Sequence, residues 1–75
     1  MLAYILITLE DANEKKILES ITKNKEVREA HILFGEWDII IKVEIENAED
    51  LARFVMEKIR SIKGVKLTST LISAR

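Results

Sequence analysis

The chain has 75 residues, of which 48% are hydrophobic and 33% are charged, and its formal net charge is −1. A chain of this length forms one small domain that buries roughly 60% of its unfolded surface, so we expect a single domain over residues 1–75 that gains stability from a partner subunit. Twelve basic and thirteen acidic residues nearly cancel, which argues against direct binding to nucleic acid or to an anionic membrane.

The residues that form disulfides and transition-metal sites are scarce. The chain contains no cysteine and one histidine, which excludes disulfides and leaves carboxylates as the ligands for a metal. We therefore expect no metal and no cofactor. Residues 1–9 are apolar, but they lack a basic start and reach about half the length of a membrane span. We interpret them as a strand and expect a cytoplasmic protein.

A strand and a helix are predicted first along the chain. Residues 2–9 place apolar side chains on both faces, which indicates a strand that is covered on both sides. Asp11, with Glu14 three residues later, is typical of a helix N-cap with a capping box. An apolar stripe at helical spacing follows, formed by Ile17, Leu18 and Ile21. We expect this helix to end near Lys23–Asn24.

Two further strands are predicted on either side of a short loop. Residues 27–34 and 39–45 are rich in branched side chains, and Gly35 lies between them, which is typical of a hairpin. The second of these strands has one strongly apolar face and one mixed face. A tight turn has no need of a tryptophan, yet Trp37, the only one in the chain, lies in this loop.

A second helix and a last strand complete the chain. Asn47 is predicted to cap the helix, with Asp50 at its third position. The apolar stripe of this helix is formed by Leu51, Phe54, Val55, Ile59 and Ile62. Gly64 is expected to end the helix in a left-handed conformation. In the strand over 65–73, alternation places Thr68 and Thr70 on the same face.

The predicted order is therefore βαββαβ, an α+β arrangement of the ferredoxin-like type. Its crossovers place two helices on one face of a four-stranded antiparallel sheet. That accounts for one apolar face of the first strand and leaves the other face without a cover. We expect the cover to be the sheet of a second copy, packed sheet to sheet as a symmetric dimer.

Several functions of this fold are disfavoured by particular residues. RNA-recognition domains stack bases on aromatic side chains of the central strands, and residues 39–45 contain none. An acylphosphatase-like enzyme needs an arginine after the first strand, where this chain has Glu10 and Asp11. Metal chaperones of this fold need a cysteine pair. None of these three classes is expected.

Two further functions remain open from the residues. One is that of a small dimeric α+β barrel enzyme, such as a monooxygenase or isomerase, with His31 and Trp37 in a cavity between the sheet and the helices. No second catalytic group is placed by the sequence, so we do not expect an enzyme. The second is that of an assembly adaptor that binds no ligand and whose stability is indifferent to small molecules.

Two motifs carry a resemblance to a known family. The first is Gly35-Glu36-Trp37-Asp38 followed by Ile39-Ile40-Ile41, and the second is Gly64-Val65 followed by Thr68-Ser69-Thr70. In this order, and over the entire chain, they resemble the effector-binding domain of the Lrp/AsnC (feast/famine) family of transcription regulators, called the RAM domain.

The resemblance implies that dimers pair through their sheets, assemble into octamers or similar rings of about four dimers, and bind free amino acids at subunit interfaces. It also implies ligand-binding roles for Gly35, Asp38, Thr68 and Thr70, with Glu36 and Trp37 as further candidates for the lining. Asp38 can pair with an α-ammonium group, and backbone N–H groups around Gly35 can receive an α-carboxylate. The competing interpretation is that these residues only form the turn and the strand.

One departure from the family concerns DNA binding. Most members carry an N-terminal helix-turn-helix domain, whereas this sequence begins at the first strand. A complete chain of this kind would resemble a stand-alone RAM module that senses amino acids and affects transcription indirectly, for example by co-assembly with full-length relatives. A truncated chain would lack the DNA-binding half. The residues do not indicate which amino acid is bound.

Overall fold

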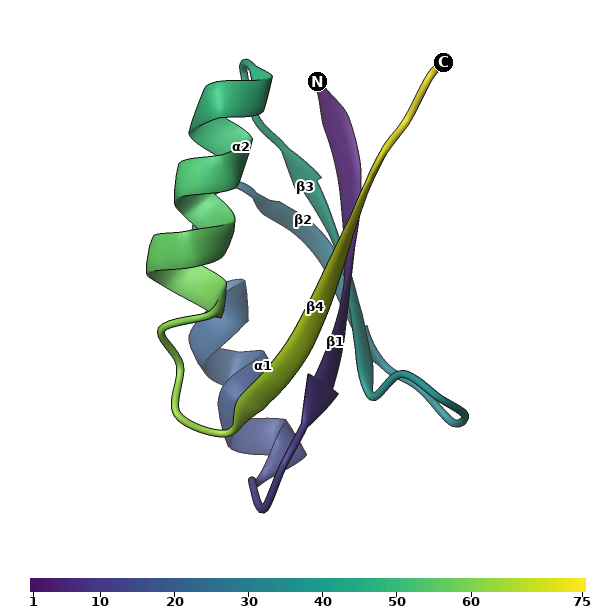
Figure 1. Ribbon diagram of the computed structural model, residues 1–75, viewed down its shortest axis with the longest axis vertical. Helices are drawn as coiled ribbons and strands as arrows, with labels where there is room; N and C mark the ends of the chain where they lie inside the picture. The colour runs from purple at the N-terminus through teal and green to yellow at the C-terminus, as the bar shows by residue number, and fades with distance from the viewer.

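The computed structural model describes residues 1–75 and contains one antiparallel sheet with the strand order β2-β3-β1-β4. Both helices cover the same face of this sheet (Figure 1). The predicted ferredoxin-like βαββαβ arrangement is therefore confirmed. The elements are β1 (Leu2–Leu9), α1 (Glu14–Thr22), β2 (Val27–Ile32), β3 (Ile39–Glu44), α2 (Ala48–Phe54), the π-helical turn η1 (Val55–Ile59) and β4 (Val65–Ile72).

The core lies between the sheet and the two helices. All buried residues are apolar, so no buried side chain requires a polar partner. Alternate residues of the two central strands point into this core, and the helices contribute the rest. The fully buried large side chains are Ile5, Ile7, Ile21, Ile39, Ile41, Val43 and Ile59.

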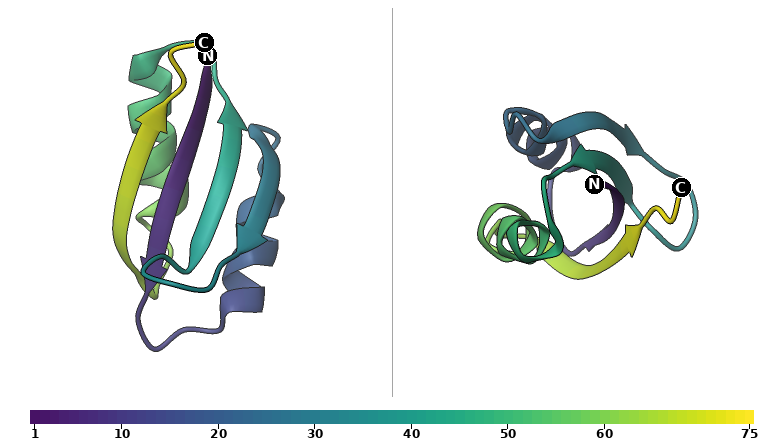
Figure 2. Two further views of the ribbon diagram at one scale, coloured as in Figure 1. Left: turned by 90° about the vertical axis from the view of Figure 1, so that its right-hand side faces the viewer. Right: turned by 90° about the horizontal axis from the view of Figure 1, so that it is seen from above.

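The other face of the sheet, which we call the outer face, is turned away from the helices (Figure 2), and it carries a partly exposed apolar surface. Its apolar members come from three strands and are Leu2, Tyr4, Leu6, Ile40, Leu67 and Leu71. Leu67 and Leu71 are 57% and 52% exposed. Both faces of β1 are therefore apolar, as predicted. That a second copy covers the outer face stays a prediction.

Helix α1 begins two residues later than the sequence predicts. The capping side chain is Asn13, whose Oδ1 accepts a hydrogen bond from Lys16 N at 3.2 Å. Asp11 instead has a φ of 47° and belongs to the turn that leaves β1. In that turn Glu10 N donates to Gly64 O at 2.8 Å. The prediction of Asp11 as the cap was therefore wrong, because this turn has already placed it in the left-handed region.

The second helix begins as predicted and ends earlier than predicted. Asn47 Oδ1 accepts from Asp50 N at 2.8 Å, which confirms the cap. The last turn widens, and Arg60 N donates to Val55 O, five residues back, at 2.8 Å. Gly64 has the predicted left-handed conformation, with φ 101°, but lies beyond the helix in the turn closed by Val65 N and Ile62 O.

Neither helix has the length and the apolar composition that a membrane-spanning helix needs.

The three later strands are shorter than predicted by one or two residues. Strand β2 ends at Ile32, β3 ends at Glu44 and β4 ends at Ile72. The loop between β2 and β3 is correspondingly longer than the turn that the sequence indicates. It projects from the sheet on the side away from the helices (Figures 1 and 2).

Candidate functional site

The loop between β2 and β3 is anchored at its base and free at its tip. At the base, Leu33 N donates to Asp38 O at 2.8 Å, and Asp38 N donates to Ile7 O at 2.9 Å. At the tip, Gly35 has a φ of 128°, a conformation that side chains rarely adopt. The base of the loop is therefore fixed against the sheet, whereas its tip remains accessible to a ligand or a partner.

The carboxylate of Asp38 has a structural partner. Its Oδ2 accepts a hydrogen bond of 2.7 Å from Leu9 N, where the pairing of β1 with β4 shifts register. The other oxygen, Oδ1, has no hydrogen-bond partner within the chain. Asp38 therefore ties the loop to β1 and still offers one oxygen of a negatively charged group.

The remaining loop residues differ in exposure. The Phe34 side chain is completely exposed, Glu36 is exposed, and Trp37 is half-buried. The sequence predicts Phe34 as the last residue of the strand over 27–34, whereas the structure places it in the loop beyond the end of β2. Its exposure could have been expected from its place next to the turn glycine, where no buried strand position remains for an aromatic side chain.

Thr68 and Thr70 lie on the helix-facing side of β4, opposite Ile7 and Ile5 of β1. The prediction that they share a face is therefore confirmed. They border a groove of about 380 Å³ between α2 and β4, which we call the α2–β4 groove. Its lining consists of Ala48, Leu51, Ala52, Val55, Met56, Arg60, Thr68, Thr70 and Ile72.

The two halves of the predicted site do not meet within one chain. The loop joins β1 from the β3 side, whereas the two threonines flank β1 from the other side. No loop residue lines the α2–β4 groove. A site that uses both halves of one chain would have to span β1, whereas two copies can bring the loop of one beside the threonines of the other.

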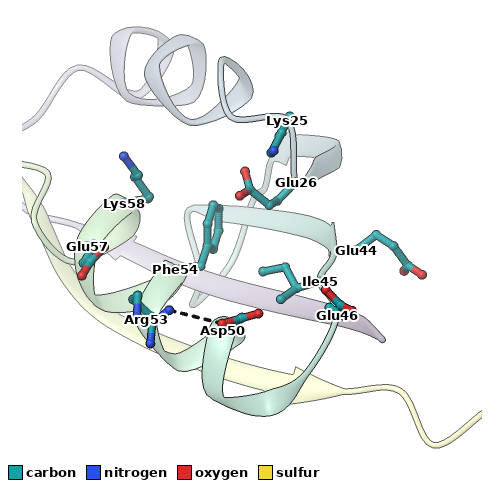
Figure 3. A pocket seen from close by; sticks show the side chains of 10 residues that line it. All are labelled: Lys25, Glu26, Glu44, Ile45, Glu46, Asp50, Arg53, Phe54, Glu57 and Lys58. Atoms are coloured by element: carbon teal, nitrogen blue, oxygen red, sulfur yellow. Dashed lines mark hydrogen bonds and ion pairs between the residues drawn. The ribbon is translucent and has the colours of Figure 1, made fainter.

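A second groove of about 380 Å³ lies at the end of the domain where the loops before β2 and α2 meet (Figure 3). Five carboxylates and three cations surround buried Ile45 and Phe54, and Asp50 pairs with Arg53 at 3.3 Å. Sequence reasoning missed this groove because its residues come from segments that are distant along the chain. The mixed charge is typical of a solvated surface. Its charged members are Lys25, Glu26, Glu44, Glu46, Asp50, Arg53, Glu57 and Lys58.

His31 lies on the outer face of the sheet and not between the sheet and the helices. Its side chain is 63% exposed, and its Nε2 lies 3.4 Å from Glu29 Oε1. The adjacent hollow of about 230 Å³ is open and is not lined by Trp37. The cavity expected for a barrel enzyme is therefore absent, because the β2 register turns His31 toward the outer face, opposite Ile40.

Glu29 also accepts a hydrogen bond of 3.2 Å from Lys42 Nζ. This bond, followed by the contact with His31, lowers the pKa of the Glu29 carboxyl below its ordinary value of 4.5. The two interactions therefore stabilise the fold at pH values above this ordinary pKa. This stabilisation is lost as the pH falls through the lowered pKa, because protonation then breaks both interactions.

We expect Lys42→Met to raise the pKa of Glu29 toward its ordinary value, because it removes the largest cause of the shift. The measurement is an NMR titration of the side-chain carboxyl carbons between pH 2 and 7. Lys15→Met on the exposed surface of α1 is the matched control and should leave the Glu29 titration in place. An unchanged titration in the Lys42 variant would contradict the assignment.

Comparisons with known proteins relate this chain to one family of regulators. A family model described as the Lrp/AsnC ligand binding domain matches residues 2–75. An uncharacterized HTH-type transcriptional regulator of Pyrococcus furiosus is 43% identical over 74 residues, which are 95% of this chain and 49% of that protein. The chain therefore spans about half the length of this relative.

Solved structures with the same fold include a hypothetical protein from Pyrococcus horikoshii, with a TM-score of 0.89 and 36% identity over 99% of this chain and 89% of that one. A transcriptional regulator from Neisseria meningitidis, solved as a complex with L-Met, has a TM-score of 0.87. At 21% identity over 99% of this chain and 49% of the other, the second likeness shows the fold alone.

Proposed function

This chain belongs to the family of Lrp/AsnC ligand-binding domains, and on that premise we propose that it binds a free amino acid at an interface between copies. Binding changes how the copies associate and thereby modulates transcription indirectly. The matched HTH-type regulator and the family model favour a regulatory role over an enzymatic one.

The observation that carries the proposal is the chemistry of the loop. The backbone N–H groups of Gly35, Glu36 and Trp37 form no hydrogen bond within the chain. Consecutive free N–H groups suit a carboxylate, and the free Oδ1 of Asp38 suits an ammonium group. Every α-amino acid carries these two groups close together. The loop therefore offers a partner to each end of the zwitterion.

The second half of the site, beside the ligand, comes from another copy. Thr68 and Thr70 contribute hydroxyl groups, which can donate and accept hydrogen bonds. The L-Met complex of the N. meningitidis regulator supports the use of this fold for a free amino acid. In this proposal Glu36 and Trp37 line the pocket and contribute to the choice of amino acid.

Assembly is part of the same proposal. The outer face exposes leucines on β4 next to the half-buried apolar residues of β1. A surface of this kind on a small domain is typical of an interface between subunits. We place the sheet-to-sheet dimer there, with rings of dimers such as an octamer as the larger assembly. Full-length relatives share this domain and are candidate partners for mixed assemblies.

The proposal is tested by thermal unfolding in the presence of each of the twenty amino acids at millimolar concentration. A ligand at ten times its Kd is expected to stabilise the fold by about 1.4 kcal/mol. That gain raises Tm by roughly 5–10 °C in a domain of this size. A Tm that no amino acid changes would favour a ligand-free assembly adaptor and contradict amino-acid sensing.

A further inference from the structure

We propose that Phe34 of one copy inserts into the α2–β4 groove of a second copy and thereby brings the β2–β3 loop beside Thr68 and Thr70. The docking itself rests on the exposure, lining and charge of the two surfaces. Its consequence for the ligand, a pocket closed by two copies, rests on the proposed function.

The first observation is the exposure of Phe34. Its side chain is completely exposed, although it is among the largest apolar side chains. The loop that carries it projects from the sheet (Figure 1). A phenylalanine buries about 150 Å² or more in a core or interface. Exposed aromatic anchors that enter a pocket on a partner contribute much of the binding energy of many interfaces. Phe34 therefore has the properties of an anchor without a pocket in its own chain.

The second observation is a groove that lacks an occupant. Six of the nine residues lining the α2–β4 groove are hydrophobic. Met56 on one wall and Ile72 on the other are 64% and 52% exposed. Its volume of about 380 Å³ lies within the usual range of binding pockets and accommodates one aromatic ring. Docking of an apolar side chain would remove both exposed walls from water.

The charges of the two surfaces are complementary. The loop carries Glu36 and Asp38 and no basic residue, whereas the groove carries Arg60 and no acidic residue. Neither Glu36 nor Arg60 forms an ion pair within its own chain. The groove of Figure 3 holds five carboxylates and three cations, and this excess of negative charge would repel the loop. A further groove near Asp11 has two carboxylates balanced by two lysines and offers no excess of positive charge.

The geometry requires two copies. The loop projects on the side of the sheet away from the helices (Figure 2), whereas the groove is lined by residues of α2 and β4. Such a contact can be made reciprocally by two copies about a two-fold axis, or repeated from copy to copy, in which case it closes rings when its rotation allows. The same contact places the free N–H groups near Gly35 beside the threonine hydroxyls of the second copy. It thus joins the two halves that one chain keeps apart.

The absence of native cysteine makes disulfide trapping a specific test. Two differently tagged chains that both keep Phe34 are co-expressed, one with Glu36→Cys in the loop and the other with Met56→Cys in the groove, and are oxidised. Because a disulfide needs Cβ atoms about 4 Å apart, we expect at least roughly tenfold more mixed disulfide than when Glu36→Cys is paired with Lys15→Cys on α1. In a third pairing the second chain carries Leu6→Cys, so that its thiol lies on the outer face and tests whether the loop contacts that face instead of the groove.

Equal trapping at positions 56 and 15, or stronger trapping at position 6, would overturn the docking. Failure of the docking and failure of amino-acid sensing are separable. Trapping at position 56 without any thermal response to amino acids would retain the contact and reject the ligand. A thermal response to an amino acid without trapping at position 56 would retain amino-acid binding and reject the docking contact.

Charge reversal gives an independent test on the cysteine-free chain. Glu36→Arg and Arg60→Glu are each expected to weaken assembly by roughly fivefold, measured by sedimentation across a concentration series. The double variant restores the opposite charges in exchanged positions and should recover most of the loss. Glu14→Arg, an equal charge change on α1, is the control and should leave assembly unchanged. Additive losses in the double variant would overturn the pairing of Glu36 with Arg60.

Discussion

Replacing Gly64 with alanine is expected to lower the free energy of unfolding by about 3 kcal/mol, from backbone strain of roughly 1–2 kcal/mol and a comparable term for overpacking. The φ of Gly64 is 101°, a conformation that side chains rarely adopt. An added Cβ would also lie 2.5 Å from the Cβ of Ala12, which has no rotamer by which to move away. The turns at this end of the domain would have to separate.

Gly35→Ala is the matched control for this prediction. Gly35 also has a positive φ, of 128°, but nothing lies within 4 Å of an added Cβ. It therefore incurs strain alone, about 1 kcal/mol. Urea unfolding of the two variants and the parent chain gives both values. Equal losses would show that the close approach of Ala12 to Gly64 has no energetic consequence.

The elements were predictable because their periodicities are clear. The two-residue alternation of 39–45 and the helical stripe beginning at Leu51 each describe a single buried face, and the structure buries that face. Asn47 was a unique candidate for its cap. For α1 the sequence offers both Asp11 and Asn13, and only the turn geometry decides between them. The π-helical turn has no sequence signal of this kind, since it depends on one backbone hydrogen bond.

The candidate site was predictable only in part. Alternation is sufficient to place Thr68 and Thr70 on one face, but it does not show that this face borders α2. The hydrogen bond between Asp38 and Leu9 joins residues 29 positions apart, and no local pattern indicates such a contact. The separation of the loop from the threonines follows from the strand order. These features depend on tertiary structure, which single-sequence patterns leave open.

The double role of Asp38 decides how its function must be tested. Asp38→Ala removes the acceptor for Leu9 N and is expected to lower stability by about 2 kcal/mol, the usual contribution of a hydrogen bond to a charged group. A lost response to amino acids in this variant would therefore be ambiguous. Asp38→Asn keeps an oxygen that can accept from Leu9 N and removes the negative charge.

We expect Asp38→Asn to remain within about 1 kcal/mol of the parent chain and to bind its amino acid roughly 10- to 100-fold more weakly, because the α-ammonium group loses its charged partner. Calorimetric titration together with urea unfolding measures both effects on one sample. Glu19→Gln on the exposed surface of α1 removes the same charge and should change neither. Unchanged affinity in Asp38→Asn would assign Asp38 to holding the loop against β1 and leave recognition of the ammonium group to another residue.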